Sequence, residues 1–455
     1  MPDRESGNQN DFMIEKIKQR PINRKKLIRR TILTASMAVI FGLIACFTFL
    51  ILEPVISNWL YPEEEPQVIV FPEDQREMSP EEMLAENLPT ESPAPADEPE
   101  TEVVTLEQEQ MEDILSRLTL DKDSYMELYD GLYHFIYDTE EITGQPSISQ
   151  YIVTIRGITS NLDWFNNVQE SDSQSSGVII ADNGRAYLVL VDYTPLKNAD
   201  SLVLELNDGY YQIEATLKGL DPSTNLAVVA VDWDNLPAEW QETGGLAVAP
   251  MGSSNSRTLA GTPVIAMGSP MGTSDSIGYG MITAANTLYT VDRNYKLLLT
   301  DIVGSKKANG ALFNLKGELI GMIAGSRTNS DMGNVINAYG ISELKKVVEK
   351  MSNEDKLPYM GISGGDVPLS AYLDLGVPRG AYVKEIDMDS PAMLAGVQRG
   401  DIITAVNDNV VTSFSDYSAL LMQIEPGQMV NLTVMRQSQA EYKEMNFAIE
   451  IEERR

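Results

Sequence analysis

The chain holds one histidine, His134, and one cysteine, Cys46. Ser–His–Asp catalysis, Cys–His catalysis and any metal site built from several histidines would therefore all depend on His134. A single cysteine also excludes an intrachain disulfide and a zinc site made of cysteines. His134 stands in a helical pattern, away from any Ser or Asp motif, so we interpret it as a surface or packing residue. We expect neither a metal site nor a cofactor.

Two arrangements without histidine remain open. Ser305 next to Lys306 and Lys307 has the composition of a Ser–Lys dyad, in which the lysine acts as the base. Adjacent residues rarely present both side chains to one reacting atom, and nothing nearby indicates the burial that lowers a lysine pKa. Asp192 is the second candidate base, and it is equally interpretable as a polar loop residue.

The N-terminal part has the pattern of a membrane anchor. Residues 1–30 form a basic tail with nine Lys or Arg against four Asp or Glu, and residues 31–52 carry no charge. An apolar run of this length crosses a hydrocarbon core of about 30 Å as a helix. The basic flank places the tail in the cytoplasm and the later domains outside, in a single-pass protein of the cell membrane. A cleaved signal peptide is the alternative.

An acidic linker and a helix are expected next. Residues 53–104 are rich in Pro, Glu and Asp, which predicts a disordered spacer. Residues 105–148 form a helical segment, in which Ser124 and Glu127 match a capping box and residues 144–146 end the helix. The formal net charge of the whole chain is −33, which argues against nucleic acid as a partner.

Two folded units follow. Residues 149–350 alternate short apolar runs with turn signals and predict a β sandwich or a pair of barrels; the strands are expected at 151–155, 177–181, 187–191, 202–206, 226–231, 264–267 and 319–323. A helix at 342–351 leads out of this unit. Residues 356–451 form a smaller α+β unit, with strands at 381–386, 402–406 and 431–436 and helices at 391–395 and 415–423.

The ordered motifs of these units resemble the HtrA/DegP-type serine proteases. The first barrel of that family is matched by Ser176-Gly177-Val178-Ile179-Ile180 and Asp221-Pro222-Ser223-Thr224-Asn225-Leu226-Ala227-Val228, and the second by Gly261-Thr262-Pro263-Val264-Ile265-Ala266-Met267-Gly268 and Asn314-Leu315-Lys316-Gly317-Glu318-Leu319-Ile320-Gly321. The PDZ domain of the family is matched by Tyr359-Met360-Gly361-Ile362 and Ala395-Gly396-Val397-Gln398-Arg399-Gly400-Asp401-Ile402-Ile403. The resemblance implies a mainly β fold: a trypsin-like double barrel followed by a PDZ domain.

The resemblance does not extend to the catalytic residues. Counting along the family motifs, the histidine position is Thr194, the aspartate position is Asn225 and the serine position is Ala308. These residues supply neither a base, nor a charge to orient an imidazolium, nor a nucleophile. Lys306 and Lys307 occupy the oxyanion loop, and Asn309 replaces a glycine there. The sequence therefore predicts a pseudoprotease.

The PDZ-like unit keeps the features of a binding site. The resemblance implies that backbone N–H groups around Tyr359, Met360, Gly361 and Ile362 hold the terminal carboxylate of a peptide, while Tyr417 and Leu421 line the pocket for its last side chain. A groove closed by packing is the alternative. The resemblance also implies a homo- or hetero-trimer with HtrA-type relatives.

The predicted function is a membrane-anchored scaffold or protein quality-control partner that binds peptides or protein C-termini. The competing hypotheses are an active envelope endopeptidase with a non-standard catalytic arrangement and a purely structural envelope protein.

Overall fold

The computed structural model describes residues 33, 35–43, 47–48, 66–74, 122–137, 146–162, 168–206, 209–238, 240, 246–256, 258–325, 334–438 and 441–454. The chain divides into two compact units, Met1–Glu65 and Pro66–Arg455. In the first unit, the described residues of the expected anchor are helical and those at 35–43 are exposed. None of the described helices has both the length and the apolar character needed to span a membrane. Most of residues 1–65 and 75–121 lie outside the described residues, so the tail, most of the linker and the anchor stay predictions.

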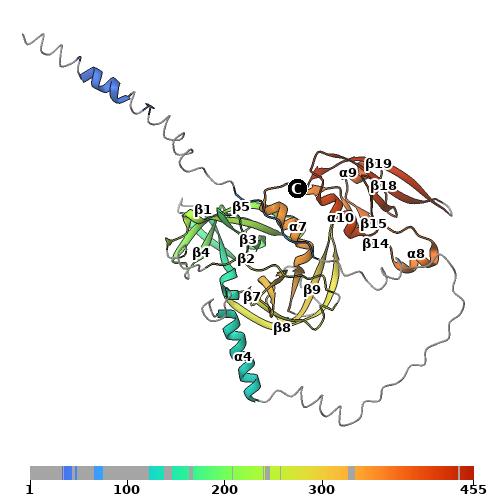
Figure 1. Cartoon of the computed structure of the whole chain (residues 1–455), viewed down its shortest axis with the longest axis horizontal. Helices are drawn as coiled ribbons and strands as arrows, with labels where there is room; N and C mark the ends of the chain where they lie inside the picture. The colour runs from blue at the N-terminus through green and yellow to red at the C-terminus, as the bar shows by residue number, and fades with distance from the viewer. Residues whose placement is uncertain are drawn as a thin grey trace, which may run out of the picture. The chain divides into compact units, whose positions relative to one another are not determined.

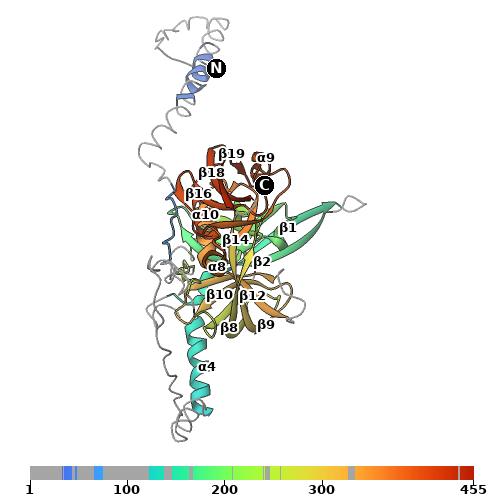
Figure 2. The ribbon, with the colours of Figure 1, turned by 90° about the vertical axis from the view of Figure 1, so that its right-hand side faces the viewer.

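The first barrel closes six antiparallel strands in the order β1-β2-β3-β6-β5-β4 (Figure 1). Their bounds are β1 Ile152–Leu162, β2 Val168–Asp182, β3 Ala186–Asp192, β4 Ser201–Leu206, β5 Tyr211–Asp221 and β6 Leu226–Asp232. β1 and β2 pair as far as Leu162 and Val168, and Figure 2 shows this long hairpin reaching away from the barrel. Short 3-10 turns at Ile148–Tyr151, Thr194–Leu196 and Trp233–Asn235 flank the strands.

The second barrel has the order β10-β11-β12-β9-β8-β7. Its strands are β7 Pro263–Ser269, β8 Ser276–Tyr289, β9 Asn294–Val303, β10 Asn309–Asn314, β11 Leu319–Ile323 and β12 Val335–Gly340, and α7 Ile341–Ser352 follows. Together the two barrels form the expected double-barrel fold.

Strands such as β3 are continuous apolar runs in the sequence because both of their faces are buried in the core. Leu188 and Leu190 on one face of β3 join a cluster that includes Ile265 and Phe313 of the second barrel. Val189 and Val191 on the other face fill the interior of the first barrel. Because both faces are buried, hydrophobicity does not alternate along the strand.

The C-terminal domain is built on a sheet of order β14-β15-β16-β18-β19, with β17 paired to β16 and β13 paired to β20. The strands are β13 Pro358–Tyr359, β14 Ile362–Asp366, β15 Ala381–Ile386, β16 Ile402–Val406, β17 Asn409–Val410, β18 Met429–Ser438, β19 Glu441–Glu450 and β20 Glu452–Glu453. Its helices are α8 Leu369–Leu375, α9 Pro391–Ala395 and α10 Phe414–Met422.

Residues 66–74, called the strap below, correct the expectation of a disordered linker over 53–104. Ile69 and Phe71 are buried in the core, whereas Val68 and Val70, which alternate with them, are exposed. The Ile69 N–H donates to the side-chain oxygen of Asn353 (2.9 Å), and the Asn353 amide donates back to the Ile69 carbonyl (2.8 Å). Polar or exposed and buried apolar residues alternate from Gln67 to Phe71, which is the pattern of a half-buried extended segment. This local pattern decides the structure of the strap, although the flanking residues are rich in Pro and Glu.

Helix α4, Lys122–Tyr137, lies within the expected helical segment. It is already helical at Lys122, two residues before Ser124, so the predicted capping box there is wrong. Ile136 is buried in the core, with Leu132 and Phe135 packed against the same cluster. His134 is on the exposed side, with its Nε2 atom 3.5 Å from the Asp130 carboxylate one turn earlier.

Candidate functional site

Thr194 and Asn225, the predicted histidine and aspartate positions, lie in adjacent segments of the first barrel. Asp192 at the end of β3 pairs with Leu226 at the start of β6, and the Tyr193 N–H donates to the Asn225 carbonyl (2.8 Å). Thr194 begins the 3-10 turn after β3 and is exposed. Asn225 has a φ of 59°, in the left-handed region that asparagine tolerates better than most residues. Thr194 and Asn225 therefore lie in adjoining segments, and neither of their side chains is a base.

Asp192 is the ionisable group beside this pair. Burial raises the pKa of its carboxyl above the usual value, and hydrogen bonds from Thr194 offset only part of that effect. One of these bonds runs from the Thr194 N–H to Asp192 Oδ1 (2.9 Å). The Asp192 carboxylate thus accepts hydrogen bonds within the turn that contains Thr194, and we interpret Asp192 as a residue that orders this loop.

Ala308, the predicted serine position, lies directly before β10 and is only 3% exposed. The Ala308 N–H donates to the carbonyl of Ser305 (3.0 Å), and the Lys307 N–H donates to Ser305 Oγ (3.1 Å). An oxyanion hole requires N–H groups of this loop to point at the reacting carbonyl. Here the Ala308 and Lys307 N–H groups are used within the loop itself. The side chains of Lys306 and Lys307 are exposed.

Asn309 fixes the end of this loop against the first barrel. Its Oδ1 accepts a hydrogen bond from the Ser176 N–H (2.7 Å), and its Nδ2 donates to the Lys307 carbonyl (3.2 Å). Ser176 Oγ and Ser269 Oγ, from β2 and β7, are 2.8 Å apart in a second hydrogen bond across the barrels. All three side chains are buried. Asn309, which is predicted to replace a glycine of the family motif, thus links the two barrels.

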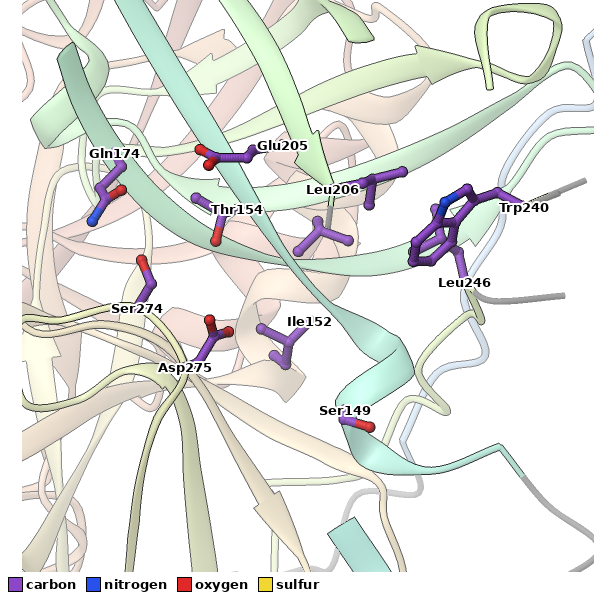
Figure 3. Close-up of a pocket in the computed structure, with 11 residues that line it drawn as sticks. Ser149, Ile152, Thr154, Gln174, Glu205, Leu206, Trp240, Leu246, Ser274 and Asp275 are labelled. Atoms are coloured by element: carbon purple, nitrogen blue, oxygen red, sulfur yellow. The ribbon is translucent and has the colours of Figure 1, made fainter. Parts of the chain in front are cut away.

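A cavity of about 530 Å³ lies elsewhere, between the β1–β2 hairpin and a loop of the second barrel (Figure 3). Thr154 and Gln174 come from the hairpin, and Ser274 and Asp275 come from the second barrel. Glu205 on its wall forms an ion pair with Arg156 (2.7 Å). Thr194, Asn225 and Ala308 do not line this cavity, and nothing in the sequence pattern indicated it.

The predicted carboxylate-binding loop of the C-terminal domain does hold a carboxylate, which belongs to Asp292. Its Oδ2 accepts hydrogen bonds from the N–H groups of Met360 and Gly361, both at 2.9 Å. Its Oδ1 accepts from the N–H groups of Gly361 (3.1 Å) and Ile362 (2.9 Å). Asp292 lies in the turn between β8 and β9 of the second barrel, and its side chain is 1% exposed.

The other predicted groove residues differ in their contacts, and one of them, Tyr417, contacts the Asp292 carboxylate itself. The Tyr417 hydroxyl donates to Asp292 Oδ1 (2.8 Å), and burial together with that carboxylate raises the pKa of Tyr417 well above its usual value. Leu421 is buried in the core of the domain. The Tyr359 hydroxyl donates to Asp387 (3.0 Å). Asp292 carries no sequence signal of this role, because a lone acidic residue in a hairpin turn is an ordinary turn residue.

Comparison with known proteins gives the same two domains. A family model for a trypsin-like peptidase domain matches residues 175–322, and one for a PDZ domain matches residues 382–436. A relative from Halomonas elongata named "Probable periplasmic serine endoprotease DegP-like" is 30% identical over 275 residues, which are 59% of this chain and 55% of the relative. Serine endoprotease DegS from Salmonella typhimurium is 28% identical over 299 residues, 63% of this chain and 79% of the relative.

Solved structures are similar as well. The HtrA-type protease AlgW with a decapeptide aligns with a TM-score of 0.47 and 21% identity, over 67% of this chain and 96% of AlgW. The chain spans a little over half the length of the DegP-like relatives it matches, 55% of one and 58% of another from Hahella chejuensis.

Proposed function

Because this chain is a homologue of the HtrA-type serine proteases, with a trypsin-like peptidase domain followed by a PDZ domain, we propose that it is a pseudoprotease that binds peptides. The observation that carries the proposal is the set of residues at the catalytic positions. Ala308 has no nucleophile, Thr194 has no basic nitrogen and Asn225 has no charge to stabilise an imidazolium.

The geometry of the oxyanion loop supports the same proposal. The Ala308 N–H is paired with the Ser305 carbonyl, so it is not directed at a substrate. The family histidine also has no substitute at a distance, since His134 lies on the exposed side of α4 beside Asp130. Ser305, the candidate nucleophile of a Ser–Lys dyad, already accepts the Lys307 N–H at its Oγ.

We assign the binding role to the PDZ domain. Domains of this kind take the C-terminus of an extended peptide along a sheet edge and hold its carboxylate with backbone N–H groups. The Met360, Gly361 and Ile362 N–H groups converge on one carboxylate in this structure, which supports such a use. The periplasmic DegP-like relatives and the basic, then apolar, N-terminal sequence support an extracytoplasmic domain anchored at residues 31–52.

The test uses the purified full-length chain with a fluorophosphonate probe and a fluorescent casein substrate. We expect neither labelling nor turnover, because there is no activated serine. Serine endoprotease DegS serves as the positive control, and a Lys306→Ala/Lys307→Ala variant is the matched negative control. Turnover by the wild-type chain that this double variant abolishes would overturn the pseudoprotease proposal and establish a lysine-based peptidase.

A further inference from the structure

The turn between β8 and β9 reproduces the contacts of a bound peptide C-terminus. The Asp292 carboxylate receives N–H donors from Met360, Gly361 and Ile362, as described above. The Asp292 N–H donates to the Ile362 carbonyl (2.6 Å), and Val291 forms an antiparallel bridge with Ser363. A carboxylate held by a backbone loop, followed by antiparallel pairing with the adjacent strand, is the binding mode of a PDZ ligand.

Further contacts hold the rest of the turn in the groove. Ser418 on α10 donates its hydroxyl to the Asp292 carbonyl (2.7 Å), and Arg454 donates to the Val291 carbonyl (2.8 Å). The Asn294 side-chain amide donates to the carbonyl of Gly364 (3.0 Å). The β8–β9 hairpin thus reaches both β14 and α10, the two elements that border a PDZ groove (Figure 1).

We propose that this turn, residues 290–294, is an internal ligand of the PDZ domain, and that a peptide with a free C-terminal carboxylate binds only when Asp292 leaves the loop. This proposal rests on the peptide-binding function proposed above. The two carboxylates require the same three N–H donors, so their binding is mutually exclusive. A tethered ligand acts at an effective concentration of the order of millimolar, which lowers the apparent affinity for a free peptide.

Displacement would also reach the peptidase domain. Arg293 follows Asp292, and its Nη1 lies 2.9 Å from the sulfur of Met422 at the end of α10. Its Nη2 lies 3.6 Å from Asp221, four residues before Asn225. The groove, the turn and the loop at the family's aspartate position are therefore in continuous contact, so withdrawal of the turn must break or move the Arg293–Met422 contact.

The test measures fluorescence anisotropy of a peptide probe with the full-length chain. The probe is a fluorescein-labelled heptapeptide pool, random in sequence except for an apolar last residue with a free carboxylate, and the same pool with amidated C-termini is its control. Asp292→Asn keeps the size of the side chain and tolerates the φ of 64°. The substitution removes the negative charge of the carboxylate. It also places an NH₂ group, which cannot accept a hydrogen bond, near the backbone N–H donors of the loop. Asp408→Asn is the matched control, because Asp408 has the same φ of 64° but is exposed in the β16–β17 turn.

We expect Asp292→Asn to bind the free-acid pool at least tenfold more tightly than the wild type, with Asp408→Asn unchanged and no gain for the amidated pool. Equal, measurable affinities of wild type and Asp292→Asn would overturn the internal ligand and leave peptide binding intact. Should Asp292→Asn fail to fold, Ser418→Ala removes only the hydroxyl on the Asp292 carbonyl, and a gain of roughly two- to tenfold is expected.

If neither the wild type nor any variant binds the peptide pool, the peptide-binding function is overturned. Amide hydrogen exchange then tests the internal ligand separately. Exchange at Met360, Gly361 and Ile362 that is slow in the wild type and faster in Asp292→Asn would still support the internal ligand, as a permanent contact between the domains. Equally fast exchange in both proteins would overturn it.

Discussion

The guanidinium of Arg293 lies 3.6 Å from the carboxylate of Asp221, and the two side chains are 5% and 0% exposed. Asp221 also accepts hydrogen bonds from the hydroxyls of Thr224 and Tyr295, both at 2.8 Å. A buried carboxylate needs such partners because water cannot reach it. The contact joins the turn between β8 and β9 to the loop that contains Asn225. It therefore makes the first barrel sensitive to the position of that turn.

Arg293→Met is expected to destabilise the fold. Removing one partner of a buried ion pair leaves an uncompensated charge and costs about 3–5 kcal/mol. The remaining hydrogen bonds of Asp221 place our expectation at the lower end of that range. Chemical denaturation of the full-length chain measures the change, with Arg399→Met, at an exposed position, as the control. Equal stability of the two variants would show that the Asp221 carboxylate does not depend on Arg293.

Restoring the catalytic residues alone is expected to restore little activity. The triple variant Thr194→His/Asn225→Asp/Ala308→Ser regains the side chains, but the N–H of residue 308 remains paired with the Ser305 carbonyl. Loss of one oxyanion donor lowers rates by about 10²–10³. Adding Lys306→Gly and Asn309→Gly frees the loop, so this five-residue variant should react with the fluorophosphonate probe about 10²–10³ faster than the triple variant. Similar labelling rates for the two variants would contradict the role of the loop.

Phe71→Ala is expected to release the strap. Truncating a buried phenylalanine costs about 3–5 kcal/mol, which corresponds to at least about a hundredfold faster local opening. Hydrogen exchange at the Ile69 and Phe71 amides reports this opening, since both donate to side chains of α7 or the residue after it. Val70→Ala is the control, because Val70 is 69% exposed. An equal effect of the two substitutions would mean that burial of Phe71 does not hold the strap.

The strap should also loosen in acid. Burial raises the pKa of Asp74, but hydrogen bonds from Lys345, Ser342 and Ser253 outweigh it and hold the pKa below its usual value of 3.8. A lowered pKa in the folded state stabilises the fold above the unfolded value, and this contribution is lost as pH falls through the folded pKa. The protection of the strap amides, that is, their exchange relative to the intrinsic rate at the same pH, should therefore decrease only below about pH 4.

The matched variant for this experiment is Asp74→Asn, which keeps the size of the side chain and removes the carboxylate. Its strap amides should be less protected than those of the wild type already at pH 6, with a smaller further loss of protection in acid. A strap in the wild type that loosens between pH 5 and pH 8 would assign its pH dependence to groups other than Asp74.

The sequence predicted the fold better than the site because the two depend on different information. Hydrophobic runs and turn residues located seven barrel strands correctly, including β3 and β6, whose two faces are both buried. Strand β8 was not predicted because its apolar residues are mixed with exposed polar ones such as Thr283, Asn286 and Thr287. The family motifs then indicated the order of the two barrels and the PDZ domain.

Hydrophobic runs, turn residues and motifs do not predict that the Asp292 carboxylate occupies the PDZ loop. Met360 and Asp292 are 68 residues apart in sequence, and only the docking of two domains brings them together. The strap was missed for a related reason: two buried residues, Ile69 and Phe71, decide its place within a region whose composition is that of a spacer. The composition of residues 53–104 is an average over the whole segment, whereas docking of the strap depends on the individual side chains of Ile69 and Phe71.

The strap changes how the chain would respond to proteolysis. It packs on α7 through Ile69 and Phe71, and α4 packs on the same body through Ile136. Residues 75–121 therefore connect two anchored points on one folded unit. A single cut within them would leave the N-terminal fragment bound through the strap, so the domains would not be shed. Release of the folded domains would require a second event, the undocking of the strap from α7. The contact between the strap and α7 would therefore keep the domains at the membrane surface that we propose.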